Sequence, residues 1–358
     1  MAASRSLPPL LQPYLSPARP SSSPEPKSLT LVTSVLGASA NWLVLRYLVS
    51  CLSAASSAQA QPSSPTSSEP TVVLVSFLRD LTFWTSSASR LGLDLAAAGR
   101  RGRFVFADGM ALFAPPPPAS ATPADAAAGT GRGAGVGPGA ARGMAPGRGS
   151  QAAATSAAAG TGTGKRDPAW HVRIPSRLDK NPQGKGNSRS EFRAIATAVS
   201  QVISKVGSGG KLGQGASRQD GDGGSENIVL VVDGLDFIQA ALEEQTSAVE
   251  DAVMSWREST SSLLLTLHAD DPLVHTQSTS LEKLHASLAL SLAHSADLVL
   301  GCRTLDTGGA SDVSGVIRIT PGGGRGWDSG GRGKGEGEKE LLYLVNSDGS
   351  AKVFERGA

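Results

Sequence analysis

Aromatic residues and cysteine are scarce in this chain of 358 residues. Aromatic residues make up 4% of it, and the two cysteines, Cys51 and Cys302, are far apart in the sequence. Two cysteines at such a distance form no metal-binding spacing and no redox pair, which argues against a zinc site or a thioredoxin-type site. We expect both to be core thiols in a protein of a reducing compartment.

A strong charge imbalance and a long apolar run are also absent. The formal net charge is +2 and the sequence pI is about 8.6, so the whole-chain charge does not predict nucleic-acid binding. The longest apolar run, Trp42–Leu52, contains Arg46 and is too short to span a bilayer. Prolines in the first 28 residues would break the amphipathic helix of a transit peptide. We expect a soluble protein of the cytoplasm, and also of the nucleus, with no membrane partner.

Much of the chain lacks the apolar residues that a core needs. Residues 114–165 are almost entirely Ala, Gly, Pro, Ser and Thr with scattered Arg, and residues 1–28 carry seven prolines. Such segments bury too little apolar surface to offset the entropy lost on ordering. We predict a disordered N-terminus at 1–28 and a single domain at 29–358. Low-complexity insertions are predicted to interrupt that domain at 55–70, 114–165, 207–225 and 320–339.

Strand and helix patterns alternate along the rest of the chain. Several strand candidates, such as Ile228–Val232, are continuous apolar runs, which is typical of a parallel sheet covered on both faces. The turn Ser347–Gly349 predicts a hairpin between the last two strands. The predicted strands are 29–34, 71–77, 103–107, 227–232, 262–267, 297–301, 313–319, 341–346 and 351–355. The predicted helices are 41–53, 80–98, 188–205, 237–258 and 279–294. A mostly parallel α/β sheet flanked by helices, with antiparallel strands at its C-terminal end, is the layout of a RecA-like domain.

Residues 29–48, LTLVTSVLGASANWLVLRYL, have the outline of a phosphate-binding turn. A short strand, a turn of small residues around Gly37 and a helix follow one another, as in a P-loop. A P-loop also needs a lysine for the phosphates and a hydroxyl for magnesium. No lysine occurs between Lys27 and Lys165, so the motif lacks its lysine in every register. We predict a turn that keeps the shape of an NTPase without its chemistry, and we expect no cofactor and no metal.

Asp233 ends the apolar strand NIVLVV, at the position where an aspartate of P-loop enzymes holds magnesium. It can equally cap a turn, or the helix that starts near Asp236. Asp108 ends another strand, and we give it the structural interpretation. A residual P-loop-type ATPase therefore stays open as one alternative.

The sequence GASAN at 37–41 is one residue short of the G-x-S-x-G nucleophile elbow of serine hydrolases. It follows a strand and precedes a helix, as that elbow does. Ser39 would be the nucleophile, Asp233 the acid and His268 the base, in the chain order of such enzymes. Asn41 replaces the final glycine and would crowd the turn. A serine hydrolase is the alternative from another functional class.

Four blocks of the sequence resemble the Elongator complex protein 6 family. The most specific is VLVSFLRDLTFW and its continuation at 73–113, in which Ser76–Asp80 is followed by Phe83-Trp84 and by Gly92–Asp94. The blocks cover most of the foldable chain, and low-complexity segments separate them. The other three blocks are 28–50, 228–237 and 262–273.

The resemblance implies a RecA-like subunit without catalytic equipment of its own. It implies assembly with Elongator proteins 4 and 5 into a ring of six chains, which binds tRNA and works with the catalytic Elongator subunits. Those subunits build the carboxymethyl-type modification of the wobble uridine in certain tRNAs. The resemblance thus implies a protein that is not an enzyme, and the missing lysine marks a turn kept as architecture.

A basic segment at 165–193 is the best candidate for contact with tRNA. It holds eight Lys and Arg residues against three acidic residues. An aromatic ring among them could stack on an unpaired base. The alternative is a solvated basic linker. The candidate contacts are Trp170, Arg173, Arg177, Lys180 and Lys185.

Four large aromatic residues come from two short segments: Trp42, Phe77, Phe83 and Trp84. They either lie in the core of the domain or face outward as partner interfaces, which in obligate assemblies are apolar. The sequence pattern leaves both interpretations open.

Overall fold

The computed structural model describes residues 7–15, 27–53, 69–113, 167–174, 188–208, 227–306, 308, 310, 312–323 and 338–356. All of them belong to one of the two units into which the chain divides, formed by 1–114 and 167–358. The predicted insertion at 114–165 lies outside the described residues, as do most of the predicted insertions at 55–70, 207–225 and 320–339.

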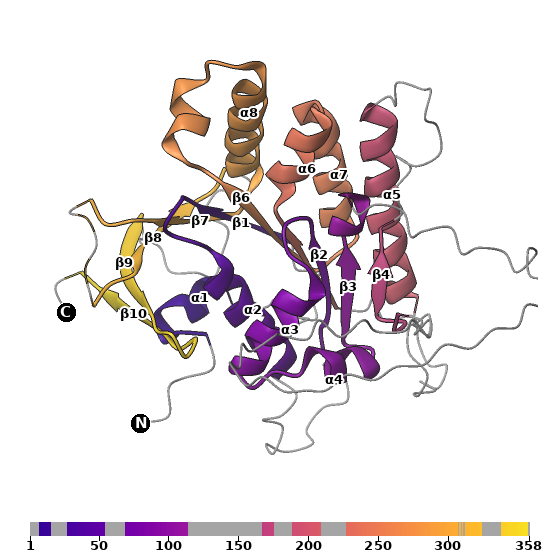
Figure 1. Cartoon of the computed structure of the whole chain (residues 1–358), viewed down its shortest axis with the longest axis horizontal. Helices are drawn as coiled ribbons and strands as arrows, with labels where there is room; N and C mark the ends of the chain where they lie inside the picture. The colour runs from indigo at the N-terminus through magenta and orange to yellow at the C-terminus, as the bar shows by residue number, and fades with distance from the viewer. Residues whose placement is uncertain are drawn as a thin grey trace, which may run out of the picture. The chain divides into compact units, whose positions relative to one another are not determined.

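The described elements follow the predicted alternation (Figure 1). The strands are β1 (Ser28–Ser34), β2 (Thr71–Ser76), β3 (Phe104–Asp108), β4 (His171–Arg173), β5 (Ile228–Asp233), β6 (Ser262–His268), β7 (Leu298–Arg303), β8 (Gly315–Pro321), β9 (Lys339–Val345) and β10 (Ala351–Glu355). The helices are α1 (Gln12–Leu15), α2 (Asn41–Ser53), α3 (Leu81–Arg90), α4 (Leu95–Arg100), α5 (Ser188–Gly207), α6 (Leu235–Leu242), α7 (Thr246–Glu258) and α8 (Ser280–Ser295). Short turns of other helix types are η1 (Pro9–Leu11), η3 (Met110–Phe113) and η4 (Pro272–Thr276).

The strands form one sheet in the order β10-β9-β8-β7-β1-β6-β5-β2-β3-β4. Neighbours from β7 to β4 are parallel, whereas β7 to β10 pair in an antiparallel way. The first strand lies in the middle, with Ser28 opposite Ser262 of β6 and Thr30 opposite Leu298 of β7. This mixed sheet, parallel at its centre and antiparallel at its C-terminal end, confirms the predicted RecA-like α/β fold class.

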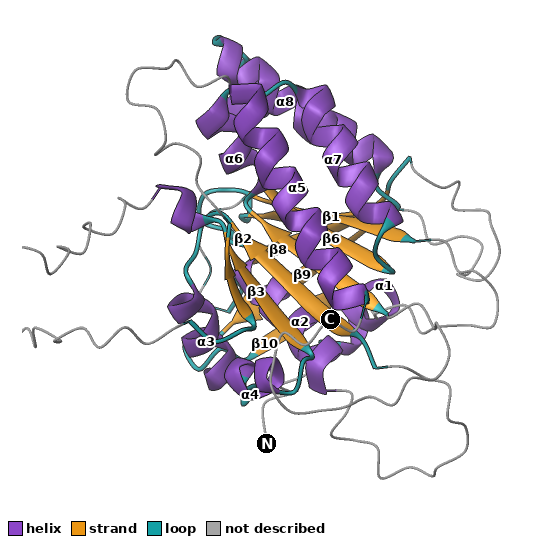
Figure 2. Ribbon diagram, turned by 90° about the vertical axis from the view of Figure 1, so that its right-hand side faces the viewer, coloured by secondary structure: helices purple, strands orange, loops and turns teal. Residues whose placement is uncertain are grey.

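Helices cover both faces of the sheet (Figure 2), with α1 to α4 on one face and α5 to α8 on the other. Successive residues of a strand point to opposite faces. In β5, Val229 and Val231 pack with the first helix layer, whereas Leu230 and Val232 pack with the second. Because both faces are buried, the central strands need apolar residues at every position, which explains their continuous apolar runs.

Two predicted helices are each broken in two. The helix predicted at 80–98 ends before Gly92, which has φ +78°, and Asp94 caps α4 by accepting a hydrogen bond of 2.8 Å from Ala97 N. The helix predicted at 237–258 breaks at Glu243, which has φ +48°. Glycine often marks such a break in a sequence, but glutamate rarely adopts this conformation. The sequence patterns also do not predict β4, an edge strand of three residues.

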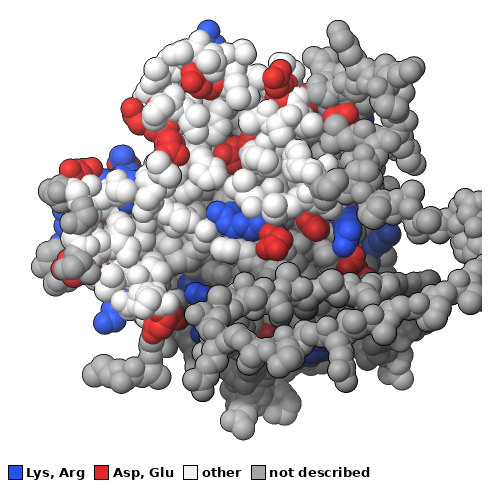
Figure 3. Space-filling model, in the orientation of Figure 1, with Lys and Arg blue, Asp and Glu red and all other residues white. Residues whose placement is uncertain are grey.

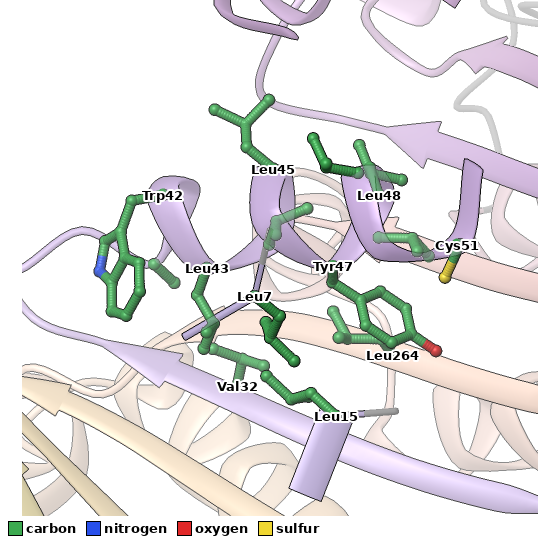
Figure 4. Packing of buried hydrophobic residues seen from close by; sticks show 14 of the residues in the cluster. Leu7, Leu15, Val32, Trp42, Leu43, Leu45, Tyr47, Leu48, Cys51 and Leu264 are labelled. Atoms are coloured by element: carbon green, nitrogen blue, oxygen red, sulfur yellow. The ribbon is translucent and has the colours of Figure 1, made fainter. Parts of the chain in front are cut away.

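The disorder predicted for residues 1–28 is wrong for residues 7–15. Leu7, Leu11 and Leu15 are buried, and Figure 4 shows Leu7 and Leu15 beside β1 and α2. Leu11 and Leu15 are four residues apart, so they lie on one face of the helical segment formed by η1 and α1, and Leu7 lies just before it. Pro9 occupies the first position of η1, where the missing N–H of proline has no partner to lose. Proline therefore excludes a long helix here but permits this short one.

The large aromatic side chains and both cysteines are part of the core. Trp42, Phe77 and Trp84 are buried and Phe83 is half-buried, so the core interpretation holds for this set. The two cysteines, Cys51 and Cys302, are free and buried, as predicted, and burial raises the pKa of each thiol to about 12. Within the described residues, every helix is too short or too polar to cross a membrane.

Candidate functional site

Polar side chains gather where the central parallel strands end. In open parallel sheets, ligands bind at the carboxyl ends of the strands. Here β2 ends at Ser76, β5 at Asp233 and β6 at His268. β5 pairs with β2 on one side and with β6 on the other, so these strand ends are neighbours in space. We call this group of residues the strand-end site.

The Asp233 carboxylate is buried and accepts four hydrogen bonds from three side chains. Arg79 Nη1 lies 2.9 Å from both Oδ1 and Oδ2. Ser76 Oγ donates to Oδ2 at 2.9 Å and Thr266 Oγ1 donates to Oδ1 at 3.1 Å. Only 2% of the Asp233 side chain and 21% of the Arg79 side chain are exposed. A buried charge is tolerated when it is paired and hydrogen-bonded, and this carboxylate is both.

Backbone groups fix the direction in which the two hydroxyls donate. Ser76 Oγ accepts a hydrogen bond of 3.1 Å from Arg79 N, and Thr266 Oγ1 accepts one of 3.0 Å from Gly234 N. Each hydroxyl has a single proton, which is thereby left for Asp233. The carboxylate is therefore held by a network that the surrounding backbone orients.

The loop between β2 and α3 positions the arginine. Asp80 caps α3 by accepting a hydrogen bond of 2.8 Å from Phe83 N, and the Arg79 guanidinium carbon lies 5.5 Å from the centroid of the Phe83 ring. Leu78 packs against Gly234, where a Cβ atom would come within 2.5 Å of Leu78 Cγ. Gly234 has φ +76°, so the turn after β5 needs glycine for conformation and for space.

The β1–α2 turn is a tight turn rather than an open phosphate cradle. Ala38 N donates to Val35 O at 2.9 Å, and Gly37 has φ +89°, as the third position of a type II turn requires. Leu36 N donates to Asp270 Oδ1 at 2.7 Å. A P-loop aims backbone N–H groups of this turn at phosphate. Here two of those groups bond to the protein itself.

A second buried carboxylate, Asp236, lies three residues after Asp233 and is only half bonded. Its Oδ2 accepts a hydrogen bond of 3.1 Å from His268 N and lies 2.8 Å from His268 Nδ1. Its Oδ1 is buried and has no hydrogen-bond partner among the described residues. The hydrogen bond to Asp236 raises the pKa of His268. His285 Nε2 lies 2.8 Å from His268 O and joins α8 to the same strand end.

The hydrolase alternative assigns Asp233 as the acid that pairs with His268, and this assignment is wrong. His268 pairs with Asp236, whereas Asp233 is bonded to Arg79. Ser39 is exposed, and its Oγ accepts a hydrogen bond of 3.2 Å from the backbone N–H two residues later, which opens α2. Serine commonly takes such a position at a helix start. Ser39 therefore has a structural partner in place of a catalytic one.

Asp108 has the structural role that the sequence indicates. Its Oδ1 accepts a hydrogen bond of 3.1 Å from Ala111 N and thereby caps the η3 turn, and its Oδ2 lies 3.7 Å from His171 Nε2. Asp233 is different, since it caps neither a turn nor α6. The N-cap of α6 is Gly234, which has no side chain to offer.

The prediction that Trp170 stacks on a nucleic-acid base is wrong. Trp170 is 7% exposed, and its ring lies 6.2 Å from the ring of Phe104, centroid to centroid. The same ring packs directly on Gly99, where a Cβ atom would come within 2.5 Å of it. A ring buried in this way has no free face for a base. It anchors the start of β4 to the sheet and to α4 instead.

The other candidate contacts with tRNA divide into two groups. Arg173 is exposed at the end of β4, and its Nε lies 2.9 Å from a carboxylate oxygen of Asp167. Arg177, Lys180 and Lys185 lie outside the described residues. On the face that Figure 3 presents, acidic and basic side chains of the described residues are interspersed, without a broad field of one sign.

Sequence patterns do not identify Arg79 and Thr266 as partners of Asp233. Arg79 belongs to the SFLRD stretch, which carries the most specific resemblance, but its partner becomes visible only when β2 lies beside β5. Thr266 stands out in the sequence only as a polar residue within the apolar run LLLTL. That single polar position in a buried strand is the signal that points to a buried partner.

The fold and the strand-end site define a class of protein. It is a RecA-like α/β domain in which the strand-end aspartate is bonded to an arginine of the same chain.

Comparisons with known proteins name no family for this chain. No family model and no curated protein matches its sequence. Among solved structures, the chain is similar to the uncharacterized protein PH0321 from Pyrococcus horikoshii, which was crystallised in complex with an unknown peptide. The identity is 11%, the match covers 98% of each chain and the TM-score is 0.48. A likeness at this level supports no transfer of function.

Proposed function

We propose that this protein is a non-catalytic subunit of the Elongator complex, part of a hetero-hexameric RecA-like ring that binds tRNA and supports modification of the wobble uridine. Four sequence blocks that resemble the Elongator protein 6 family support the proposal. The observation that carries it is the bonding of Asp233 by Arg79, because Arg79 belongs to the most specific of those blocks. The implied partners are Elongator proteins 4 and 5, the catalytic Elongator subunits and tRNA.

The Arg79 guanidinium lies beside Asp233, where an active P-loop enzyme would hold a metal ion. In such enzymes a strand-end aspartate holds the magnesium that bridges the phosphates. Here the guanidinium lies 2.9 Å from both oxygens of Asp233, so a protein cation already neutralises the carboxylate. Removing one partner of a buried ion pair costs about 3–5 kcal/mol, which a competing metal would have to offset. This arrangement supports a chain that lacks ATPase chemistry.

Calorimetric titration of the isolated chain with Mg-ATP tests the proposed lack of catalytic equipment. We expect no binding heat at nucleotide concentrations up to about 1 mM, the upper end of usual substrate affinities. Tight binding would favour a residual ATPase instead. Ester hydrolysis that disappears in the Ser39→Ala variant would favour a serine hydrolase.

Co-expression with Elongator proteins 4 and 5 tests the proposed assembly. We expect the three proteins to elute together in equal amounts, with the mass of a six-chain ring. Each partner expressed singly with this chain serves as the control for pairwise binding. A chain that elutes alone in the presence of both partners would overturn the proposal.

Binding of tRNA to the assembled ring tests the basic segment. We expect joint replacement of Arg177, Lys180 and Lys185 by Ala to weaken binding and to flatten its salt dependence, by about one unit of slope per lost phosphate contact. Arg173→Ala tests the remaining basic candidate contact separately, because its Nε lies 2.9 Å from a carboxylate oxygen of Asp167. Unchanged affinity and slope in the triple variant would leave the segment as a linker.

A further inference from the structure

A cavity of about 210 Å³ opens between α2, the C-terminal end of α3 and the tip of the β9–β10 hairpin. It shares no lining residue with the strand-end site. Four apolar residues and a set of polar ones line it. The lining consists of Trp42, Leu45, Leu91 and Val345, together with Ser87, Arg90, Asn346, Ser347 and Gly349.

Partly buried hydrogen bonds hold the hairpin wall of this cavity in place. Arg46 of α2 is 1% exposed, and its Nη2 donates to Gly349 O at 2.5 Å. Asn346 N donates to Ser350 O at 2.9 Å, and Asn346 Nδ2 donates to Ser350 Oγ at 2.7 Å. A Cβ atom on Gly349 would come within 3.3 Å of Leu91 Cδ2, so the tip packs directly on the end of α3. The cavity is therefore preformed in the free chain.

The floor is aromatic and the rim carries a positive charge. Trp42 stacks on Tyr343 with their ring centroids 4.8 Å apart, and Figure 4 shows Trp42 and Leu45 on the first turns of α2. The Trp42 indole N–H is buried. Arg90 is exposed at the rim, and in the part of the chain that the structure describes the next carboxylate along the chain, Asp94, lies 3.8 Å from Arg100 instead.

Size and charge together select the occupant. Pockets for small molecules usually have volumes of about 300–1,000 Å³, so about 210 Å³ suits one large side chain better. Protein interfaces are commonly anchored by single aromatic or apolar side chains that fill such preformed pockets. Asp348 at the hairpin tip accepts a hydrogen bond of 2.7 Å from Ser350 N and forms no ion pair with Arg90 among the described residues, so Arg90 complements an acidic group beside that anchor.

We propose that this cavity is a docking site for a partner polypeptide, which inserts one large apolar side chain over Trp42 and Leu91 and places a neighbouring Asp or Glu at Arg90. The site does not depend on the proposed role in Elongator, since its residues are separate from the strand-end site. It adds a second contact surface, on the helix layer formed by α1 to α4.

Titration of the ¹⁵N-labelled full chain with short capped peptides tests this proposal. The probes are acetyl-Gly-Trp-Asp-Gly-amide, the same peptide with Asn in place of Asp, and the same peptide with Ala in place of Trp. The readout is the indole N–H signal of Trp42, assigned with the Trp42→Phe variant. We expect saturable binding of the Trp-Asp peptide with a Kd on the order of 1 mM, about 2–5-fold weaker binding of the Trp-Asn peptide, and no binding of the Ala peptide.

Variants separate the cavity from unspecific binding. Arg90→Gln should give the Trp-Asp and Trp-Asn peptides equal affinity. Ser347→Trp, at the exposed hairpin tip, should fill the cavity and abolish the signal change, whereas Ser255→Trp, on the exposed face of α7, should leave it intact. The proposal is overturned when the Trp-Asp peptide does not saturate the signal, or binds equally well to Ser347→Trp. Tighter binding of free indole-3-propionate than of the peptide would reassign the cavity to small aromatic acids.

Discussion

Asp233 and Asp236 are both buried at the junction of β5 and α6, yet the protein satisfies them in different ways. Asp233 accepts four hydrogen bonds and pairs with an arginine. Asp236 bonds through one oxygen to His268, and its other oxygen has no partner among the described residues. Arginine keeps its charge at every physiological pH, whereas histidine does not. The strand-end site therefore combines one permanent ion pair with one that titrates.

Removal of Arg79, the permanent counter-charge of Asp233, should have the largest effect on the free energy of unfolding. We expect Arg79→Ala to lower the free energy of unfolding by about 3–5 kcal/mol, because it leaves the Asp233 charge buried and unpaired. Arg90→Ala, at the exposed end of the next helix, is the matched control and should stay within about 0.5 kcal/mol of the parent. Urea denaturation measures both. Equal losses in the two variants would show that Asp233 does not need Arg79.

Removal of one hydroxyl donor should have the next largest effect. Thr266→Val keeps the shape of the side chain but removes both its hydrogen bond to Asp233 and the acceptor of Gly234 N, and we expect a loss of about 1.5–3 kcal/mol. Thr33→Val in β1 is the control, because no described charged group bonds to the Thr33 hydroxyl. Denaturation of the two variants under one set of conditions gives the comparison. If Thr266→Val loses no more unfolding free energy than the control, the hydrogen bond from Thr266 to Asp233 does not stabilise the fold.

Gly234 lies between Asp233 and Asp236 in the sequence. A substitution at Gly234 tests how tightly this loop packs on Leu78, next to Arg79. We expect Gly234→Ala to destabilise by about 1–3 kcal/mol, because φ +76° strains alanine and the new Cβ pushes on Leu78 next to Arg79. Gly102→Ala is the control, since Gly102 has φ +72° but open space around it. The difference between the two variants isolates the clash. Equal melting temperatures of the two would mean that Leu78 moves aside freely.

Removal of the titratable pair, His268 and Asp236, should have the smallest effect on the free energy of unfolding, and only at low pH. The hydrogen bond to Asp236 raises the folded-state pKa of His268 above its ordinary value of 6.5. The stabilisation is therefore complete below the unfolded-state pKa and is lost as the pH rises through the folded-state pKa. The His268 side chain is 39% exposed, so solvent screens the pair and we expect only about 0.2–1 kcal/mol.

His268→Gln checks this pH dependence. The difference in unfolding free energy between parent and variant should be larger at about pH 5.5 than at about pH 8.5. Leu290→Gln, at an exposed position of α8, removes no titratable group and is the control for the substitution itself. A difference that grows with rising pH would contradict the raised pKa.

The order and type of most elements can be predicted from this sequence, for a physical reason. The central strands are buried on both faces, so runs such as Ile228–Val232 are apolar at every position and stand out. Asp80 marks the start of α3 as its cap, whereas the predicted helix at 80–98 runs through Gly92, near which α3 ends. The hairpin across Ser347–Gly349 follows from its turn residues.

Features that depend on long-range contacts could not be predicted. The pairing of Arg79 with Asp233 joins residues far apart in the sequence. Neither segment alone predicts that β2 lies beside β5, which is what brings the two residues together. Glu243 adopts a left-handed conformation, and because the residue is not a glycine the sequence does not predict a helix end there. The buried segment 7–15 looks unstructured, because its prolines dominate the pattern and the apolar surface that receives it comes from α2 and β1.

The place of β1 in the middle of the sheet has a consequence for protein synthesis. β1 pairs only with β6 and β7 among the described strands, and Ser28 faces Ser262. A ribosome that adds about 5–20 residues per second needs roughly 10–50 s to extend the chain by the 234 positions from Ser28 to Ser262. Throughout that time the nascent chain carries β1 without the two strands that flank it in the sheet. The central strand therefore cannot pair with its neighbours until most of the chain has been synthesised, so the sheet closes late in synthesis.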